Sequence, residues 1–304
     1  MEINSKKIYI MSFFVLTLLT LNSFLGCLSN DIFRLENCWD SELSYNRLAV
    51  VLNQKYLEKS DVDTINNDLE TEINSIYNTS KKKIYTSCIV YNGKTTISTK
   101  KNSQECNLIG IDNEFLDFFK LHLIKGRLPD ENNQAEVVLS EDLAGFLFGT
   151  TDVLSKDITI NDSLYTVVGI TNSENENNAY ISYFDSSTIP TSDVYNTCLY
   201  CIMPKVYDGY SEQILGENIP EKVTVINVSN WYKFYYQLKM IITSEKDYYS
   251  NEIPIQLLHE YRVSKQLFYL KISMVILSIT FICLCTYWLV KYIHKKSKYN
   301  RDKN

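Results

Sequence analysis

Cysteines are the residues of this chain whose spacing first suggests chemistry, and the sequence contains eight of them. Cys198 and Cys201 are separated by two residues, the spacing of a redox pair or of half a zinc site. The segment from Thr197 to Met203, however, has the pattern of a β-strand. Residues three apart on a strand point to opposite faces, so this pair is poorly placed for a local disulfide or a shared metal. We expect buried structural cysteines here, with a functional thiol as the alternative.

The other cysteines do not define a disulfide framework. Cys283 and Cys285 lie within an apolar run near the C-terminus, and Cys27 lies at the membrane edge of another near the N-terminus. Between these runs the cysteines are odd in number, so their pairing stays open. They are Cys38, Cys88, Cys106, Cys198 and Cys201.

Other groups that carry chemistry are scattered. The segment from Gly145 to Gly149 lacks the Lys and the Ser or Thr of a phosphate-binding loop. Paired carboxylates occur in capping or loop contexts, where charge is solvated or complements a helix dipole: Asp61 with Asp63, and Glu174 with Glu176. The three histidines are far apart in the sequence: His122, His259 and His294. We therefore predict no enzyme, and we nominate no catalytic, cofactor-binding or metal-binding residue.

The overall charge argues against a nucleic-acid partner. The formal net charge is −6, and the middle of the chain offers no basic face to offset it. The abundance of Asn, Ile, Lys and Tyr suggests an AT-rich bacterial genome.

Two apolar runs are long enough to cross a bilayer, which requires about 20 helical residues. The first extends from Ile8 to Leu28 and follows Lys6 and Lys7. The second extends from Ile272 to Val290, ends in Tyr287 and Trp288, and precedes a basic tail. By the positive-inside rule both ends of the chain are cytoplasmic. We predict transmembrane helices at 1–28 and 266–293, an extracytoplasmic domain at 29–265, and a basic cytoplasmic tail at 294–304.

Alternatives remain open for the first run and for the tail. The first run is also compatible with a cleaved signal peptide. The segment from Phe24 to Cys27 loosely resembles a lipobox, which gives a lipoprotein anchored at Cys27. In the preferred interpretation the basic tail only determines the membrane topology. The alternative is that it binds anionic membrane lipid or a partner.

The outer region alternates between strand and helix patterns. Helices are expected at Asp31–Leu48 as a stalk, from Ser60 as N-cap through Ile73, and at Asp112–Phe119, Ser140–Gly149 and Asn230–Thr243. Strands are expected at Leu48–Leu52, Leu108–Ile111, Glu136–Leu139 and Lys222–Val228. Hairpins are expected to turn at Asn92-Gly93 and near Asp162-Ser163.

The chain from Ile255 to Val290 reads as one uninterrupted helix, because no Gly or Pro occurs within it. The fold class is therefore α+β, a mixed α/β extracytoplasmic core domain on a two-helix stalk between two transmembrane helices. The aromatic segment from Trp231 to Tyr236 packs in the core in the preferred interpretation, with contact to a partner or to the bilayer surface as the alternative.

An ordered set of short motifs in the central stretch resembles a known family. The set comprises Gly110-Ile111-Asp112, Phe115, Phe118-Phe119, Lys125-Gly126-Arg127, Val137-Val138-Leu139-Ser140, Leu143-Ala144, Leu147-Phe148-Gly149 and Thr166-Val167-Val168-Gly169-Ile170. It is similar to the extracytoplasmic core domain of MacB-type ABC transporter permeases, in the MacB/FtsX-like superfamily, over about residues 60–170. The family usually has Gly where Ser155 precedes Lys156.

The resemblance implies a permease-like subunit that couples a cytoplasmic ATPase to the outer domain. Expected partners are an ABC ATPase subunit, and a full-length permease or a second copy of this chain. Members of this family continue into further spans, whereas this sequence ends at Asn304, so we expect a permease truncated after its second span. The alternative from another class is an extracytoplasmic binding or sensing module without transport activity.

Overall fold

The computed structural model describes residues 15, 17, 45–52, 57–77, 84–133, 135–172, 176–184, 194–219, 223–242 and 253–301. The chain divides into two compact units. The sheet unit comprises Glu36–Asn230 and Asp247–Leu258, and the helical unit comprises Met1–Leu35, Trp231–Lys246 and His259–Asn304. Each unit is described by itself.

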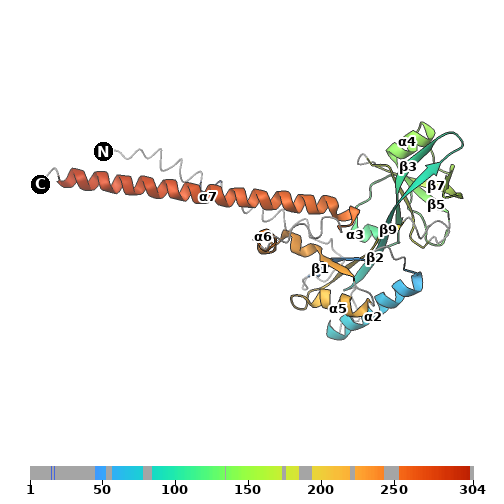
Figure 1. Ribbon diagram of the computed structural model, residues 1–304, viewed down its shortest axis with the longest axis horizontal. Helices are drawn as coiled ribbons and strands as arrows, with labels where there is room; N and C mark the ends of the chain where they lie inside the picture. The colour runs from blue at the N-terminus through green and yellow to red at the C-terminus, as the bar shows by residue number, and fades with distance from the viewer. Residues whose placement is uncertain are drawn as a thin grey trace. The chain divides into compact units, whose positions relative to one another are not determined.

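The described strands of the sheet unit form one ten-stranded sheet. Its order is β10-β1-β9-β2-β3-β8-β5-β7-β4, with β6 pairing both β2 and β7. Figure 1 shows the long strands β3, β2 and β9 at its centre. The strands are β1 (Tyr45–Val51), β2 (Thr86–Ser98), β3 (Ser103–Ile111), β4 (Leu123–Gly126), β5 (Glu136–Ser140), β6 (Asp157–Ile160), β7 (Ser163–Thr171), β8 (Asn178–Ser182), β9 (Val194–Pro204) and β10 (Thr224–Asn227).

Part of this sheet closes on itself. Strand β6 pairs β7 along its length and also pairs the end of β2, through Ile97 with Ile160 and Ser98 with Thr159. The strands β2, β3, β8, β5, β7 and β6 therefore form a closed ring. Closure leaves the short strand β4 as the edge at this end of the sheet, and a short edge lowers the risk of edge-to-edge aggregation.

Helices cover the sheet with their apolar faces. The inner face of α2 (Lys59–Tyr77) buries Ile65, Leu69 and Ile73, the residues whose four-residue spacing predicts this face. Helix α5 (Tyr210–Asn218) lies against α2, as Figure 1 also shows. Helix α4 (Glu141–Phe148) buries Leu143, Ala144 and Leu147, and the short helix α3 (Phe115–Phe118) follows β3. This confirms the predicted mixed α/β class.

The predicted hairpin at Asn92-Gly93 is wrong. Strand β2 runs without interruption from Thr86 to Ser98, and the turn to β3 lies at Thr99–Asn102 instead. At Asn92 and Gly93 the register against β9 shifts, which marks a β-bulge. The reason is tertiary: β3 and β9 both pair with β2 across this dipeptide, and their hydrogen bonds outweigh its local preference for a turn.

Two helix predictions also need correction. Helix α2 begins at Lys59 and its first backbone bonds go to the Glu58 carbonyl, so Ser60 lies inside the helix and is not its N-cap. The predicted stalk helix up to Leu48 is wrong for its last residues, because Tyr45–Leu48 belong to β1. Residues 31–44 of that prediction lie outside the described residues.

Two other local predictions are confirmed with small shifts. Ser140 occupies the N-cap position of α4, although its hydroxyl accepts the Asn178 N–H instead of capping the helix, and Gly149 ends the helix in the left-handed conformation. The hairpin between β6 and β7 turns through Asn161 and Asp162, both with positive φ, one residue earlier than expected.

The helical unit contains α6 (Phe234–Ile242) and most of α7 (Ile255–Arg301). The predicted helix Asn230–Thr243 is two pieces, because a 3₁₀ turn at Val228–Tyr232 precedes α6. Helix α7 is continuous, as predicted. Among the described residues, its portion Gln256–His294, which contains an 18-residue stretch of mean hydropathy 2.2, is the one helix long and apolar enough to cross a membrane.

The predicted first span lies outside the described residues, apart from Val15 and Thr17, which are both helical.

The packing of α4 predicts that two of its residues contribute very differently to the free energy of unfolding. Leu143 is fully buried, whereas Phe146 is 54% exposed. We expect Leu143→Ala to lower the free energy of unfolding by about 2–5 kcal/mol, because it leaves a cavity. Phe146→Ala is the matched control and should change it by less than about 0.5 kcal/mol. Urea-dependent pulse proteolysis of the detergent-solubilised chain measures both, and equal losses would contradict the assigned orientation of α4.

Candidate functional site

The first turn of α7 is fastened to the centre of the sheet by one side chain. Gln256 forms a reciprocal amide pair with Asn92 of β2, in which the Asn92 Nδ2 donates to the Gln256 Oε1 at 3.0 Å and the Gln256 Nε2 donates back to the Asn92 Oδ1. The Tyr200 hydroxyl of β9 donates to the same Oε1 at 3.2 Å. Two adjacent strands therefore hold the helix start through a single residue.

Local sequence places Gln256 at this point. Pro254 ends the preceding segment and its carbonyl accepts the Leu257 N–H, as at the start of a helix. Leu257 is 1% exposed, and Ile253 is buried on the other side of the proline. Apolar burial thus fixes the helix start, and the amide pair fixes its orientation.

An aromatic cluster surrounds the tyrosine of this anchor. The ring of Tyr200 meets Phe119 edge-on at 4.8 Å and lies 6.4 Å from Phe118. Phe115 extends the cluster to Phe119 and to Tyr180 of β8. Burial raises the pKa of Tyr200 well above its usual range, so its hydroxyl remains protonated and keeps donating to Gln256.

A buried carboxylate stands at the entrance to α3. The Asp112 Oδ2 accepts the Ile89 N–H at 2.6 Å, which ties β2 to the end of β3. Its other oxygen, Oδ1, is buried and has no hydrogen bond of ordinary geometry among the described residues. Burial raises the pKa of Asp112 to about 7, although the Ile89 N–H and the neighbouring Cys88 thiol partly oppose this; Glu114 and Glu131 add to it.

An arginine clamp closes the segment between β4 and β5. Arg127 forms a bidentate ion pair with Glu136, and the Asp130 N–H and Asn133 Nδ2 donate to the same carboxylate. The hydrogen bonds from Arg127 lower the pKa of Glu136 and raise that of the guanidinium. Gly126 precedes the clamp with φ +78°, and a Cβ there would lie 2.1 Å from the Val168 carbonyl oxygen. Only glycine fits this approach of β4 to β7.

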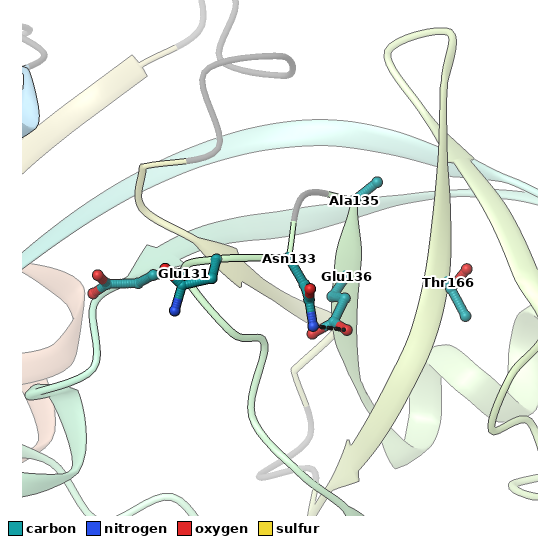
Figure 2. Close-up of a pocket in the computed structure, with 6 residues that line it drawn as sticks. Glu131, Asn133, Ala135, Glu136 and Thr166 are labelled. Atoms are coloured by element: carbon teal, nitrogen blue, oxygen red, sulfur yellow. Dashed lines mark hydrogen bonds between the residues drawn. The ribbon is translucent and has the colours of Figure 1, made fainter.

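The open depression beside this clamp has a volume of about 630 Å³. Figure 2 shows Glu131, Asn133, Ala135, Glu136 and Thr166 around it. Its carboxylates are already engaged, because Glu136 is held by Arg127, and Glu131 accepts the Asn113 N–H and pairs with Lys59. The depression therefore presents mainly neutral amide and hydroxyl groups and is poorly suited to proton transfer.

The cysteines with redox spacing are both buried on β9, where the sequence places them. Burial raises the pKa of Cys198 and of Cys201 to about 12, so both are thiols at neutral pH and are unreactive. They have different neighbours: Cys201 lies 3.8 Å from the Tyr85 hydroxyl, and Cys198 lies by Tyr200. Within the described part of the chain, no group of three or more His, Cys, Asp or Glu could hold a metal ion.

Sequence reasoning missed the residues that this site uses. The sequence patterns place Asn92 in a turn and give no role to Gln256 or Tyr200. Asp112 enters only within the Gly110-Ile111-Asp112 motif and as the start of an expected helix. Two features of the sequence could have indicated these residues. One is a polar Gln in the otherwise apolar first turn of the helix, beside Leu257, and the other is an Asn within a strand rich in β-branched residues.

The amide pair predicts energetic coupling between Asn92 and Gln256. Asn92→Ala and Gln256→Ala should each lower the free energy of unfolding by about 1 kcal/mol, since each breaks the reciprocal pair and leaves amide groups of its half-buried partner without their hydrogen bonds. The double variant should cost less than the sum of the two. Gln213→Ala, at an exposed amide of α5, is the neutral control. Urea-dependent pulse proteolysis of the full chain gives the four values, and strict additivity would contradict the contact.

The raised pKa of Asp112 predicts the direction in which the stability of the folded chain changes with pH. Because its pKa is about 7 in the folded chain and 3.8 ordinarily, the folded state binds more protons between these values. Stability should therefore fall as pH rises from about 4 to about 7 and level off above that.

The variant Asp112→Asn should remove this part of the slope, because the amide oxygen still accepts the Ile89 N–H and carries no charge. Each raised pKa unit corresponds to about 1.4 kcal/mol, so the variant should be the more stable protein at pH 8. Thermal unfolding across the pH range measures this, with the exposed Asp68→Asn as control. A variant with the wild-type slope would refute the assignment.

Comparison with known proteins agrees with the resemblance found in the sequence. Among solved structures, the periplasmic region of MacB from Actinobacillus actinomycetemcomitans is 19% identical, with a TM-score of 0.44 and coverage of 69% of this chain and 97% of that one. The extracellular domain of the noncanonic ABC-type transporter YknZ from Gram-positive bacteria is 16% identical, with a TM-score of 0.43 and coverage of 60% and 100%. Among curated proteins, none matches.

The family described as the MacB-like periplasmic core domain matches residues 40–219. This range contains the whole ordered motif set from Gly110 to Ile170, including the Asp112 junction, the Arg127–Glu136 clamp and helix α4. This chain belongs to the family of the MacB-like periplasmic core domain.

Proposed function

We propose that this chain is a permease-like membrane subunit of a MacB-type ABC system, which passes the movement of a cytoplasmic ATPase to an extracytoplasmic domain. The observation that carries the proposal is the anchor of α7: one continuous helix has its first turn bonded to the central strands and its later turns apolar. The family match supports the assignment of the sheet unit.

The proposed topology has two membrane spans. The segments 1–28 and 266–293 cross the bilayer, 29–265 lies outside, and the basic tail 294–304 lies in the cytoplasm with the N-terminus. Support comes from the exposed apolar side chains of α7, such as Ile276, Ile282 and Leu289, each more than half exposed. A helix that is apolar all round is typical of a membrane span.

A helix anchored at its end is suited to mechanical transmission. From Gln256 to Ile272 the helix rises about 24 Å, and within it there is no Gly or Pro at which it could bend. Displacement of the span along or across the membrane would therefore act on the bond between Gln256 and the strands β2 and β9. A flexible Gly/Ser linker in the same place would absorb the movement.

In this proposal the sheet unit binds or moves its target without covalent chemistry. Several of its charged groups are engaged in ion pairs and hydrogen bonds that hold the domain together, as in the clamp of Arg127 with Glu136 and the pair of Lys59 with Glu131. The partners of the chain are an ABC ATPase and either a full-length permease or a second copy of itself.

The proposal predicts that an ATPase accompanies the chain out of the membrane. Purification of the tagged full chain from native membranes in mild detergent should recover an ABC ATPase. Deleting His294–Asn304 should abolish the recovery while the protein remains in the membrane fraction, because the cytoplasmic contact is removed. A variant with the tail lysines changed to arginine keeps the charge and is the matched control.

Other outcomes distinguish the alternative function. Recovery of the wild-type chain alone, with no ATPase, would count against a permease role and favour an extracytoplasmic binding or sensing module. The lipoprotein alternative predicts a mature N-terminus at a lipidated Cys27, which mass spectrometry of the purified chain detects as an added lipid mass.

A further inference from the structure

Helix α6 contacts the outer half of α7 within the helical unit. Trp231, just before α6, meets Tyr261 edge-on at 5.2 Å, and Phe234 lies 5.5 Å from Phe268. Gln237 donates to the Ser264 carbonyl oxygen at 3.4 Å and also to the Trp231 carbonyl. Three contacts spread over two turns of α7 fix α6 against it.

The side of α6 that turns away from α7 is aromatic and basic. Tyr235 is 79% exposed, the largest exposure among the large hydrophobic side chains of the described residues. Lys239, one helical turn later, is also exposed. On α7 the neighbouring Tyr269 is 60% exposed. Large aromatic side chains with a polar tip, set beside lysines, favour the boundary between water and hydrocarbon.

The position of α6 along α7 coincides with that boundary. Phe268, which contacts α6, precedes the apolar run at Ile272 by four residues, or about 6 Å along the helix axis. The described parts of 231–242 and 259–271 contain one acidic residue, Glu260, and five basic ones, although the whole chain carries a net charge of −6. The basic residues are Lys233, Lys239, Arg262, Lys265 and Lys271.

We propose that α6 is an interfacial helix, which lies on the extracytoplasmic surface of the bilayer with Tyr235 and Lys239 among the lipid headgroups. The inference rests on the proposed crossing of the membrane by α7 and goes beyond it, because a span needs no such helix. The occupant is the lipid surface: Phe234 of α6 contacts Phe268, directly before the exposed Tyr269 and Leu270 of α7, and the positive charge of this region complements anionic headgroups.

The physical role of such a helix is to fix the depth of α7 in the bilayer. A single apolar helix can slide or tilt at modest cost, whereas an aromatic and basic helix bonded to it resists movement out of the interface. This resistance to movement would reach α7 through the residues that join the two helices, which are Trp231, Phe234 and Gln237.

The experiment places the photoreactive aromatic p-benzoylphenylalanine at position 235 of the full chain. The protein is reconstituted in nanodiscs of phosphatidylethanolamine and phosphatidylglycerol, irradiated, and examined by intact mass spectrometry. Two matched positions serve as controls: Ile282, 60% exposed within the apolar run, and Tyr207, 52% exposed in the sheet unit. We expect a mass shift of one phospholipid at 235 and at 282, and no lipid adduct at 207.

The controls separate failure of this inference from failure of the proposed topology. Lipid adducts at 282 without any at 235, or a cross-link from 235 to a protein or a second copy, would overturn the interfacial helix and leave the span intact. Absence of lipid at both positions would overturn the span and the inference with it. Equal labelling at 207 would show non-specific capture and would also overturn the inference.

Discussion

Strand β2 is the element on which the rest of the sheet unit depends, because it pairs with three other strands. It bonds to β3 and β9 along its length and to β6 at its end, and this last contact closes the ring of strands. Its backbone also donates from Ile89 to the buried Asp112, and its side chain at Asn92 holds the start of α7. A change in the register of β2 would move all of these contacts at once.

The polar residues of the family motifs and their partners stabilise turns and strand ends instead of facing a substrate. Asp112 satisfies a backbone donor where β3 meets α3, and Glu136 collects donors from Arg127, Asp130 and Asn133. Gly126 allows β4 to approach β7 where any side chain would collide with Val168. Motif residues of this kind identify a fold, which is why they lead to a family without leading to an active site.

Periodic patterns were sufficient for elements that bury one face. Ile65, Leu69 and Ile73 predicted α2, the apolar Val137–Leu139 predicted β5, and the absence of Gly and Pro predicted α7 as one helix. The same reasoning failed at Asn92-Gly93, because a local turn preference of this kind competes with pairing to two neighbouring strands. It also missed the anchor at Gln256, whose partners are separated from it by 164 and 56 residues.

The sequence alone therefore determined the fold class, the family and the long apolar helix, since each depends on residue types repeated at short spacing. Only the tertiary structure decided that β2 is continuous, that Asp112 is buried, and that α6 lies against α7. Hydrogen bonds and ring contacts between distant segments create these features. A pattern within one segment does not specify which distant residues that segment will contact. The candidate site consists of such contacts, so it appeared only when the chain was folded.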